Sequence, residues 1–388
     1  MTDGSSLHAQ TSTGLRGACS TIGWGLYCAS SWTWCIGMFL PIILLRDFGW
    51  SAFWVFAIPN VVGCTAFGYV LNAKRSKALI QSHARPIRLF ALTTVVYQIF
   101  FIGYGTSIYL FSDGSLAEDF WPVLGVVLTL CAAAAAFALR GDLFWMIFGV
   151  CAAIAAIIFY AITLSFTGGY AEASGPENGF TIAWGAPLII IGFLLNPYLD
   201  PTFHRARQKA PSRHAFLVFG IVFSFMLAFS SLTFDPKTLG PIILPVIMGQ
   251  WMIQLVYTIG ANLKEIAHLP HARIGASLMF LAAVLIGTVA GLPGIADERI
   301  YLSLLGIYAV PFPLYAITAI AAGPMHPMPR FANILIIVLS LAIAPATWMG
   351  FVHLQTPWLL AAIVAMLVGG TIIGIIVRKK RIQTSISS

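Results

Sequence analysis

The chain has 388 residues, of which 59% are hydrophobic and only 9% are charged. A soluble protein would carry about a quarter charged residues, so the composition excludes a soluble globular protein and indicates a polytopic membrane protein. The formal net charge of +8 does not indicate nucleic-acid binding, because the basic residues lie in short segments between apolar runs, where they meet lipid head groups.

Twelve stretches reach the roughly 20 apolar residues that a helix needs to cross a bilayer. They cover residues 20–45, 50–71, 88–110, 120–139, 143–166, 180–199, 215–234, 239–260, 273–294, 300–322, 331–350 and 357–378. The predicted fold is therefore all-α, with about 12 transmembrane helices. Two groups of five spans, 20–166 and 180–322, would form an inverted 5+5 repeat, since an odd number of spans inverts the topology.

The distribution of Lys and Arg predicts the orientation of the chain. Eighteen of the 21 fall on one side of the predicted membrane, and only Arg46, Lys237 and Arg299 fall on the other. Basic loops face the cytoplasm, so we expect both termini there. We divide the chain into a cytoplasmic tail, a transporter core, two further transmembrane helices and a basic cytoplasmic tail. These parts are residues 1–19, 20–322, 323–378 and 379–388.

The first span contains an unusual stretch, Cys28–Pro41, with the sequence CASSWTWCIGMFLP. Ser30, Ser31 and Thr33 place hydroxyl groups at bilayer depth, and Trp34 adds an amphipathic ring. This pattern favours a helix that is interrupted in the membrane, where free backbone groups must find partners. The alternative is a continuous helix that Gly and Pro only kink.

The sixth span carries breaker residues as well. Gly185 and Pro187 lie in its outer half, Gly192 beyond the middle, and Asn196–Pro197 and Asp200–Pro201 at its inner end. Interrupted helices in corresponding positions of two halves indicate a transporter binding site.

Asp200 is the nearest ionisable residue to the membrane interior. It is either a coupling residue or an interfacial group paired with the neighbouring His204 and Arg205.

The eighth span places Gln250, Gln254 and Tyr257 at i, i+4 and i+7, on one helical face. These polar groups cannot favourably face lipid, so they either join helices or line a path. In the tenth span, Pro311 and Pro313 predict a strong distortion.

The stretches CASSWTWCIGMFLP, RDFGW and FAIPNVVG resemble the first two core helices of bacterial sodium/solute symporter-like proteins. Those proteins belong to the amino acid–polyamine–cation transporter superfamily with the LeuT-type fold. The end of the sixth span, NPYLDPTFHRAR, is similar to segments of the same proteins. The resemblance implies that interrupted spans 1 and 6 hold substrate and that sodium binds between spans 1 and 8, here at Ser31 and Thr258. Span 8 lacks the clear Ser/Thr pair of that family.

We therefore predict a secondary active transporter that moves a small polar solute across the bacterial inner membrane by alternating access, with Na⁺ as coupling ion. The predicted substrate-binding residues are Ser30, Ser31, Thr33, Trp34, Gly185, Pro187, Gly192, Gln250 and Gln254. The alternative is a non-transporting membrane sensor or scaffold, in which the polar groups join helices. No catalytic motif or metal-ligand cluster indicates an enzyme, a metal site or a cofactor other than Na⁺. The sequence does not indicate an oligomeric state.

Overall fold

The computed structural model describes residues 4–33, 35–110, 116–167, 179–231, 240–270 and 275–387, and these ranges contain helices and no strand. Seven of the described helices are long and apolar enough to cross a membrane, or eight if one bent pair counts as a single span. The structure therefore confirms the predicted all-α, multi-pass membrane protein.

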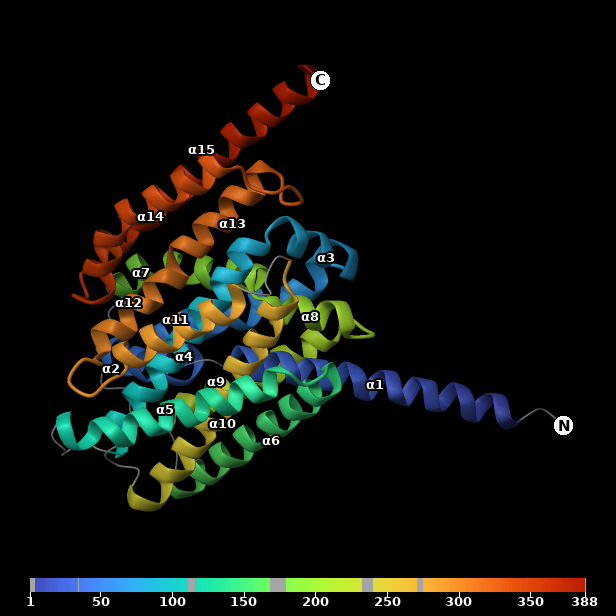
Figure 1. Ribbon diagram of the computed structural model, residues 1–388, viewed down its shortest axis with the longest axis vertical. Coiled ribbons are helices and arrows are strands. Elements are labelled where there is room, and N and C mark those ends of the chain that lie inside the picture. Colours follow the sequence, from blue (N-terminus) through green and yellow to red (C-terminus); the bar gives the residue numbers. More distant parts are fainter. Residues whose placement is uncertain are drawn as a thin grey trace.

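Each of the twelve predicted spans overlaps a helix, a part of a helix or a pair of helices (Figure 1). The first half contains α1 (Gly4–Trp32), α2 (Cys35–Val70), α3 (Ala73–Ser82), α4 (Ala84–Leu110), α5 (Leu116–Ala138) and α6 (Asp142–Thr167). The second half contains α7 (Gly179–Leu195), the 3₁₀ helix η1 (Asn196–Leu199), α8 (Pro201–Lys209), α9 (Ala215–Ser230), α10 (Gly240–His268), α11 (Gly275–Ala290), α12 (Glu298–Ala309) and α13 (Pro311–Ala322). Two further helices follow, α14 (Arg330–Phe351) and α15 (Pro357–Ser387).

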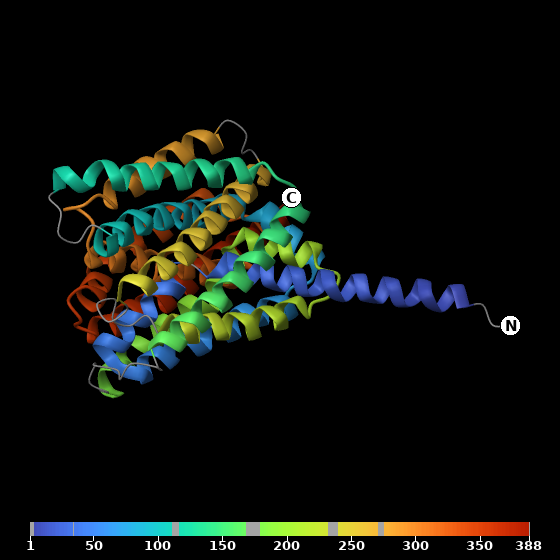
Figure 2. The same cartoon turned by 90° about the horizontal axis from the view of Figure 1, so that it is seen from below.

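The helices form one bundle, from which the N-terminal part of α1 extends as a single helix (Figures 1 and 2). Helices α14 and α15 lie along one side of this bundle and pack against α13 and α7. The rest of α1 lies inside, in contact with α6, α8, α9 and α10. The first span is thus surrounded by protein.

The first span is interrupted where its polar residues predicted. Helix α1 ends at Trp32, with a last helical bond from the Thr33 amide to the Ala29 carbonyl at 3.0 Å, and α2 begins at Cys35. Helix α2 then turns sharply at Gly49, whose φ of 76° favours glycine. Its first part, residues 35–48, completes span 1, and its second part, residues 50–70, forms span 2.

The sixth span breaks at Asn196–Asp200, with a bend of 57° between its two parts. Proline disfavours a helical conformation in the residue before it, and Asp200, directly before Pro201, is extended, with φ of −82° and ψ of 114°. The side chain of Asp200 accepts a hydrogen bond from the Thr202 amide and caps the start of α8. The open backbone of span 6 therefore lies at its inner end.

The tenth span is distorted as predicted. It is divided at Val310, whose φ and ψ are −123° and −69°, and α13 starts at Pro311. The side-chain amide of Asn196 donates to the Tyr308 carbonyl at 3.0 Å. A side chain at the break of span 6 thus provides a hydrogen-bond partner for a backbone carbonyl beside the break of span 10.

Candidate functional site

The breaks in spans 1 and 6 lie side by side. The hydroxyl oxygens of Ser31 in α1 and Thr202 in α8 are 2.9 Å apart. The ring of Trp32 packs edge-on against Phe203, with 4.9 Å between the ring centroids. All four side chains are buried. The two interrupted helices that the sequence predicts as counterparts therefore meet at their interruptions.

Side chains from three other helices satisfy the open backbone of span 1. The Cys35 amide donates to Gln98 of α4 at 3.4 Å, and Tyr301 of α12 donates to the Cys35 carbonyl at 3.1 Å. On the other side of the break, the amide of Gln254 in α10 donates to the Ser30 carbonyl. The break is thus enclosed by α4, α10 and α12, and each of these partners is uncharged.

Several amide atoms around this break have no partner in the part of the chain that the structure describes. They are Nε2 of Gln98, Oε1 of Gln254, and both side-chain polar atoms of Gln250. All three glutamines are buried. Leaving a buried polar group unpaired costs about 1–3 kcal/mol, so such groups call for a partner such as a bound solute or water. The glutamines offer both donors and acceptors.

The predicted polar face of α10 is directed at α1. Gln254 donates to the Ser30 carbonyl, and the Tyr257 hydroxyl lies 3.4 Å from the Tyr27 carbonyl of α1 and 3.3 Å from the Trp145 carbonyl of α6. Thr258 donates to the Gln254 carbonyl at 3.0 Å, within its own helix. Gln250 lies one turn beyond Gln254 on the same face.

The hydroxyl groups of span 1 divide between two roles. Ser30 donates to the Gly149 carbonyl of α6 at 2.8 Å, so it joins two helices. Ser31 and Thr33 donate to carbonyls of their own helix, at 3.0 and 2.7 Å. Of these three residues, Ser31 is the one whose oxygen lies next to span 6. Trp34 lies outside the described residues.

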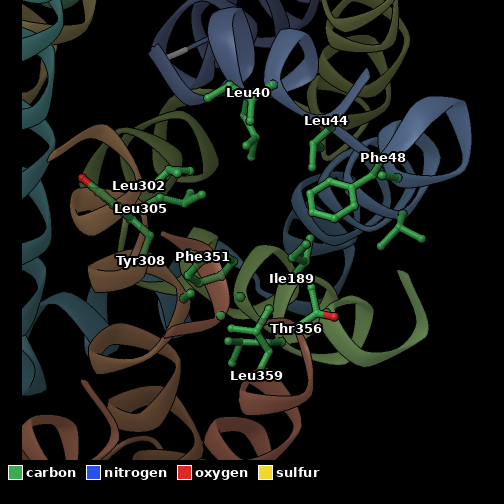
Figure 3. Close-up of a pocket in the computed structure, with 18 of the residues that line it drawn as sticks. Leu40, Leu44, Phe48, Ile189, Leu302, Leu305, Tyr308, Phe351, Thr356 and Leu359 are labelled. Carbon is green, nitrogen blue, oxygen red and sulfur yellow. The ribbon is translucent and has the colours of Figure 1, made fainter. Parts of the chain in front are cut away.

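The structure does not bring the predicted glycines of span 6 to this site. Gly185 and Pro187 lie inside the continuous helix α7, where Pro187 removes one helical hydrogen bond but does not interrupt the helix. Gly185 and Gly192 instead line a mostly apolar cavity of about 80 Å³, which Asn196 in the break of span 6 also lines. Figure 3 shows the labelled side chains around this cavity, among them Leu40, Leu44, Phe48, Ile189, Leu302, Leu305, Phe351 and Leu359.

A larger cavity, of about 460 Å³, lies between the ends of α2 and α7, together with α3, η1 and α13. It is lined by Arg75 and His83 and reaches Tyr198 and Leu199 in the break of span 6. The basic loop residues around it lie on the side that the Lys and Arg distribution predicts as cytoplasmic.

Asp200 is a buried acidic residue whose surroundings the sequence does not reveal. Its side chain is fully buried, at 0% exposure. The neighbouring basic groups bond elsewhere: Arg205 pairs with Glu265 at 2.8 Å, and His204 contacts Ser76 and the Tyr198 carbonyl. The interpretation of Asp200 as an interfacial group paired with His204 and Arg205 is therefore wrong. An Asp directly before a Pro is typical of the start of a helix, so the pair Asp200–Pro201 could have indicated that a new helix begins here.

No protein-family model matches the chain, and neither does any curated protein. Solved structures do match over nearly the whole length. A Na⁺-coupled sialic acid symporter in a substrate-bound outward-open state has a TM-score of 0.56 at 14% identity, over 91% of this chain and 89% of that one. Mhp1, a nucleobase-cation-symport-1 family transporter in a closed conformation with bromovinylhydantoin bound, has a TM-score of 0.50 at 14% identity, over 93% of both chains.

The chain has the LeuT-type fold. At 14% identity the likeness concerns the architecture alone. The resemblance that the sequence shows in its first two spans is thus confirmed for the fold.

Proposed function

We propose that the protein is a secondary active transporter that moves a small polar solute across the bacterial inner membrane by alternating access, with both termini in the cytoplasm. The observation that carries this proposal is the meeting of two interrupted helices at Ser31 and Thr202. Helix breaks expose backbone groups only where protein, solute or water can satisfy them. Paired breaks in the two halves of a repeat are typical of transporter binding sites.

We propose a solute site between the break of span 1 and the three glutamines. Ser31, Gln98, Gln250 and Gln254 would contact the solute, with Ser30 and Thr33 holding the helix end in place. The partners of the break are neutral, and the unpaired amide atoms include both donors and acceptors. This chemistry suits an uncharged solute with its own donors and acceptors, because an ionic one would be buried without a counter-charge.

The cavity lined by Gly185 and Gly192 would lie on the route between this site and the side opposite the termini. Its walls are mostly apolar, so we assign it to passage rather than to binding. Pro187 would shape α7 along that route. Trp34 as an aromatic wall of the site stays a prediction.

Na⁺ at Ser31 and Thr258 also stays a prediction. Both hydroxyls donate their protons to backbone carbonyls, so their oxygens keep lone pairs that could face a cation. The nearby Ser30 carbonyl, however, accepts from Gln254. A cation that used this carbonyl would have to displace the Gln254 amide.

One observation favours the alternative of a non-transporting sensor or scaffold. The Cys35 amide, the Cys35 carbonyl and the Ser30 carbonyl all have side-chain partners, as expected if the polar residues only join helices. The unpaired atoms of Gln250 are what this alternative does not explain.

A thermal-shift experiment distinguishes these proposals. Purified protein is heated with uncharged cyclic amides, starting with bromovinylhydantoin, and separately with the anion sialic acid. A ligand at 100 times its Kd stabilises the folded state by about 2.7 kcal/mol. We expect a cyclic amide to raise the Tm of the wild type but not of Gln250→Leu. Stabilisation by sialic acid alone, or equal shifts in both proteins, would contradict the proposed site.

A further inference from the structure

We propose that Asp200 is a proton-binding site in the break of span 6, which holds its proton in the closed arrangement and releases it when water reaches the break. The site itself rests on the geometry of this break. Its role in coupling a proton to transport rests on the proposed function. The resemblance in the sequence implies Na⁺ as coupling ion, so this site adds a second, chemically different ion.

The two carboxylate oxygens of Asp200 have different surroundings. Oδ1 accepts hydrogen bonds from the amide and the hydroxyl of Thr202, both at 2.7 Å. Oδ2 has no hydrogen-bond partner in the described residues, although it is buried. Capping of α8 therefore uses one oxygen and leaves the other available.

The basic groups near Asp200 in the chain, and Lys264 beside Glu265, are paired with other residues. Arg205 is engaged with Glu265, and His204 is held by Ser76 and the Tyr198 carbonyl. Lys264 pairs with Asp142 at the edge of α6. The titratable groups on the surrounding elements that interact electrostatically with Asp200 are Cys28 of α1, Cys64 of α2, Glu265 of α10 and Tyr308 of α12.

Thiols, a phenol and a second carboxylate do not compensate a buried negative charge. Transfer of an unpaired carboxylate out of water is so costly that the group takes a proton instead. The closed arrangement of spans 1 and 6 thus favours the neutral acid. An arrangement that admits water favours the carboxylate, because water can then solvate the charge.

Asp200 is connected to the contact between the two breaks, and it lies next to a cavity from which water can reach it. Thr202 donates to Asp200 and lies 2.9 Å from Ser31, so the proton site touches the contact between the two breaks. Leu199, the residue before Asp200, lines the cavity of about 460 Å³. When that cavity extends past Leu199, the O–H bond of the acid breaks, a water molecule takes the proton, and the carboxylate remains.

Infrared difference spectroscopy tests this site without knowledge of the solute. The protein is reconstituted in lipid and titrated with H⁺ in the absence and presence of Na⁺, and the C=O band of protonated carboxylic acids is recorded. Asp200→Asn keeps an oxygen that can cap α8, so this variant should fold. Asp297→Asn is the matched control, because Asp297 caps α12 in the same way but is exposed to solvent.

We expect the wild type and Asp297→Asn to show the same protonated-acid band at neutral pH, and Asp200→Asn to lack it. A band that is absent from the wild type, or unchanged in Asp200→Asn, would overturn the proposal. A wild-type band that disappears when Na⁺ is added at constant pH would also overturn it and assign the site to Na⁺. None of these outcomes depends on solute transport, so the proton site and the proposed function can fail separately.

Discussion

Ser31 of α1 and Thr202 of α8 are 171 positions apart in the chain, yet their hydroxyl oxygens lie 2.9 Å from each other. The contact joins the end of one interrupted helix to the start of another. Because each helix has a break rather than a continuous hydrogen-bond ladder here, either half can tilt without breaking a helix. A movement of α8 would therefore be transmitted to α1.

Loss of the Ser31 hydroxyl should uncouple these two helices. We expect Ser31→Ala to cost about 0.5–1.5 kcal/mol of stability and to weaken binding of the cyclic amide that raises the Tm of the wild type. We expect Ser31→Leu to abolish uptake of the same compound in proteoliposomes. Ser224→Leu is the control, since Ser224 also donates to a carbonyl of its own helix but lies on the exposed face of α9. Unchanged uptake by Ser31→Leu would exclude Ser31 from the site.

Two glutamines on the same face of α10 should respond in opposite directions to replacement by leucine. Gln250→Leu removes a buried amide without partners, so we expect it to stabilise the protein by about 1–3 kcal/mol and to abolish ligand binding. Gln254→Leu leaves the Ser30 carbonyl unpaired and should destabilise the protein by a similar amount. Unfolding in SDS measures the free energy of unfolding of both variants. Destabilisation by Gln250→Leu would instead favour a role in joining helices.

The ion pair between Arg205 and Glu265 should hold α8 closed against α10. Both side chains are largely buried, with 15% and 5% exposure. We expect Glu265→Gln to cost on the order of 3 kcal/mol, because it leaves a buried guanidinium without its partner. Glu298→Gln breaks a more exposed pair with Arg46 and should cost less than about 1 kcal/mol. Equal costs in an unfolding assay would mean that burial does not strengthen the first pair.

His83, between α3 and α4, should make stability depend on pH. Burial lowers its pKa below the usual value of 6.5, against the opposing effect of the Pro324 carbonyl. The unfolded chain therefore binds a proton that the folded protein does not. The stabilisation is complete above pH about 6.5 and is lost as the pH falls from there toward the lowered pKa of the folded state.

A thermal unfolding series from pH 5 to 7.5 measures this dependence, with His83→Gln as the comparison. The neutral ring of His83 contacts Tyr315 and the Pro324 carbonyl, both at 2.7 Å. We expect the Tm of the wild type to rise with pH more steeply than that of the variant. Parallel curves would show that His83 does not contribute.

The break in span 1 could be predicted because its cause is local. Hydroxyls and tryptophans at Ser30–Trp34 do not suit a lipid-facing helix, and α1 does end at Trp32. In span 6, Gly185 and Pro187 predict an interruption in the outer half, but a single proline removes only one helical hydrogen bond. The two X-Pro pairs around η1, together with a capping Asp, end the helix instead.

The setting of the site could not be predicted, since it depends on packing between distant segments. Gln98 is one of several polar residues of the third span that form no motif, and only the packing of the Cys35 amide against it singles it out. The burial of Asp200 likewise results from the helices around it and from Arg205 turning toward Glu265. In the sequence, the same residues would equally allow an interfacial ion pair.

The accessibility of Cys35 tests alternating access most directly. Cys35 begins α2 at the break of span 1 and is fully buried. It is kept as the sole cysteine, and membrane-impermeant thiol reagents are applied to right-side-out and to inside-out vesicles. Cys131, which is buried in α5, serves as the sole-cysteine control. We predict that Cys35 reacts from both sides and Cys131 from neither; reaction of Cys35 from one side only, or from none, would contradict alternating access at this break.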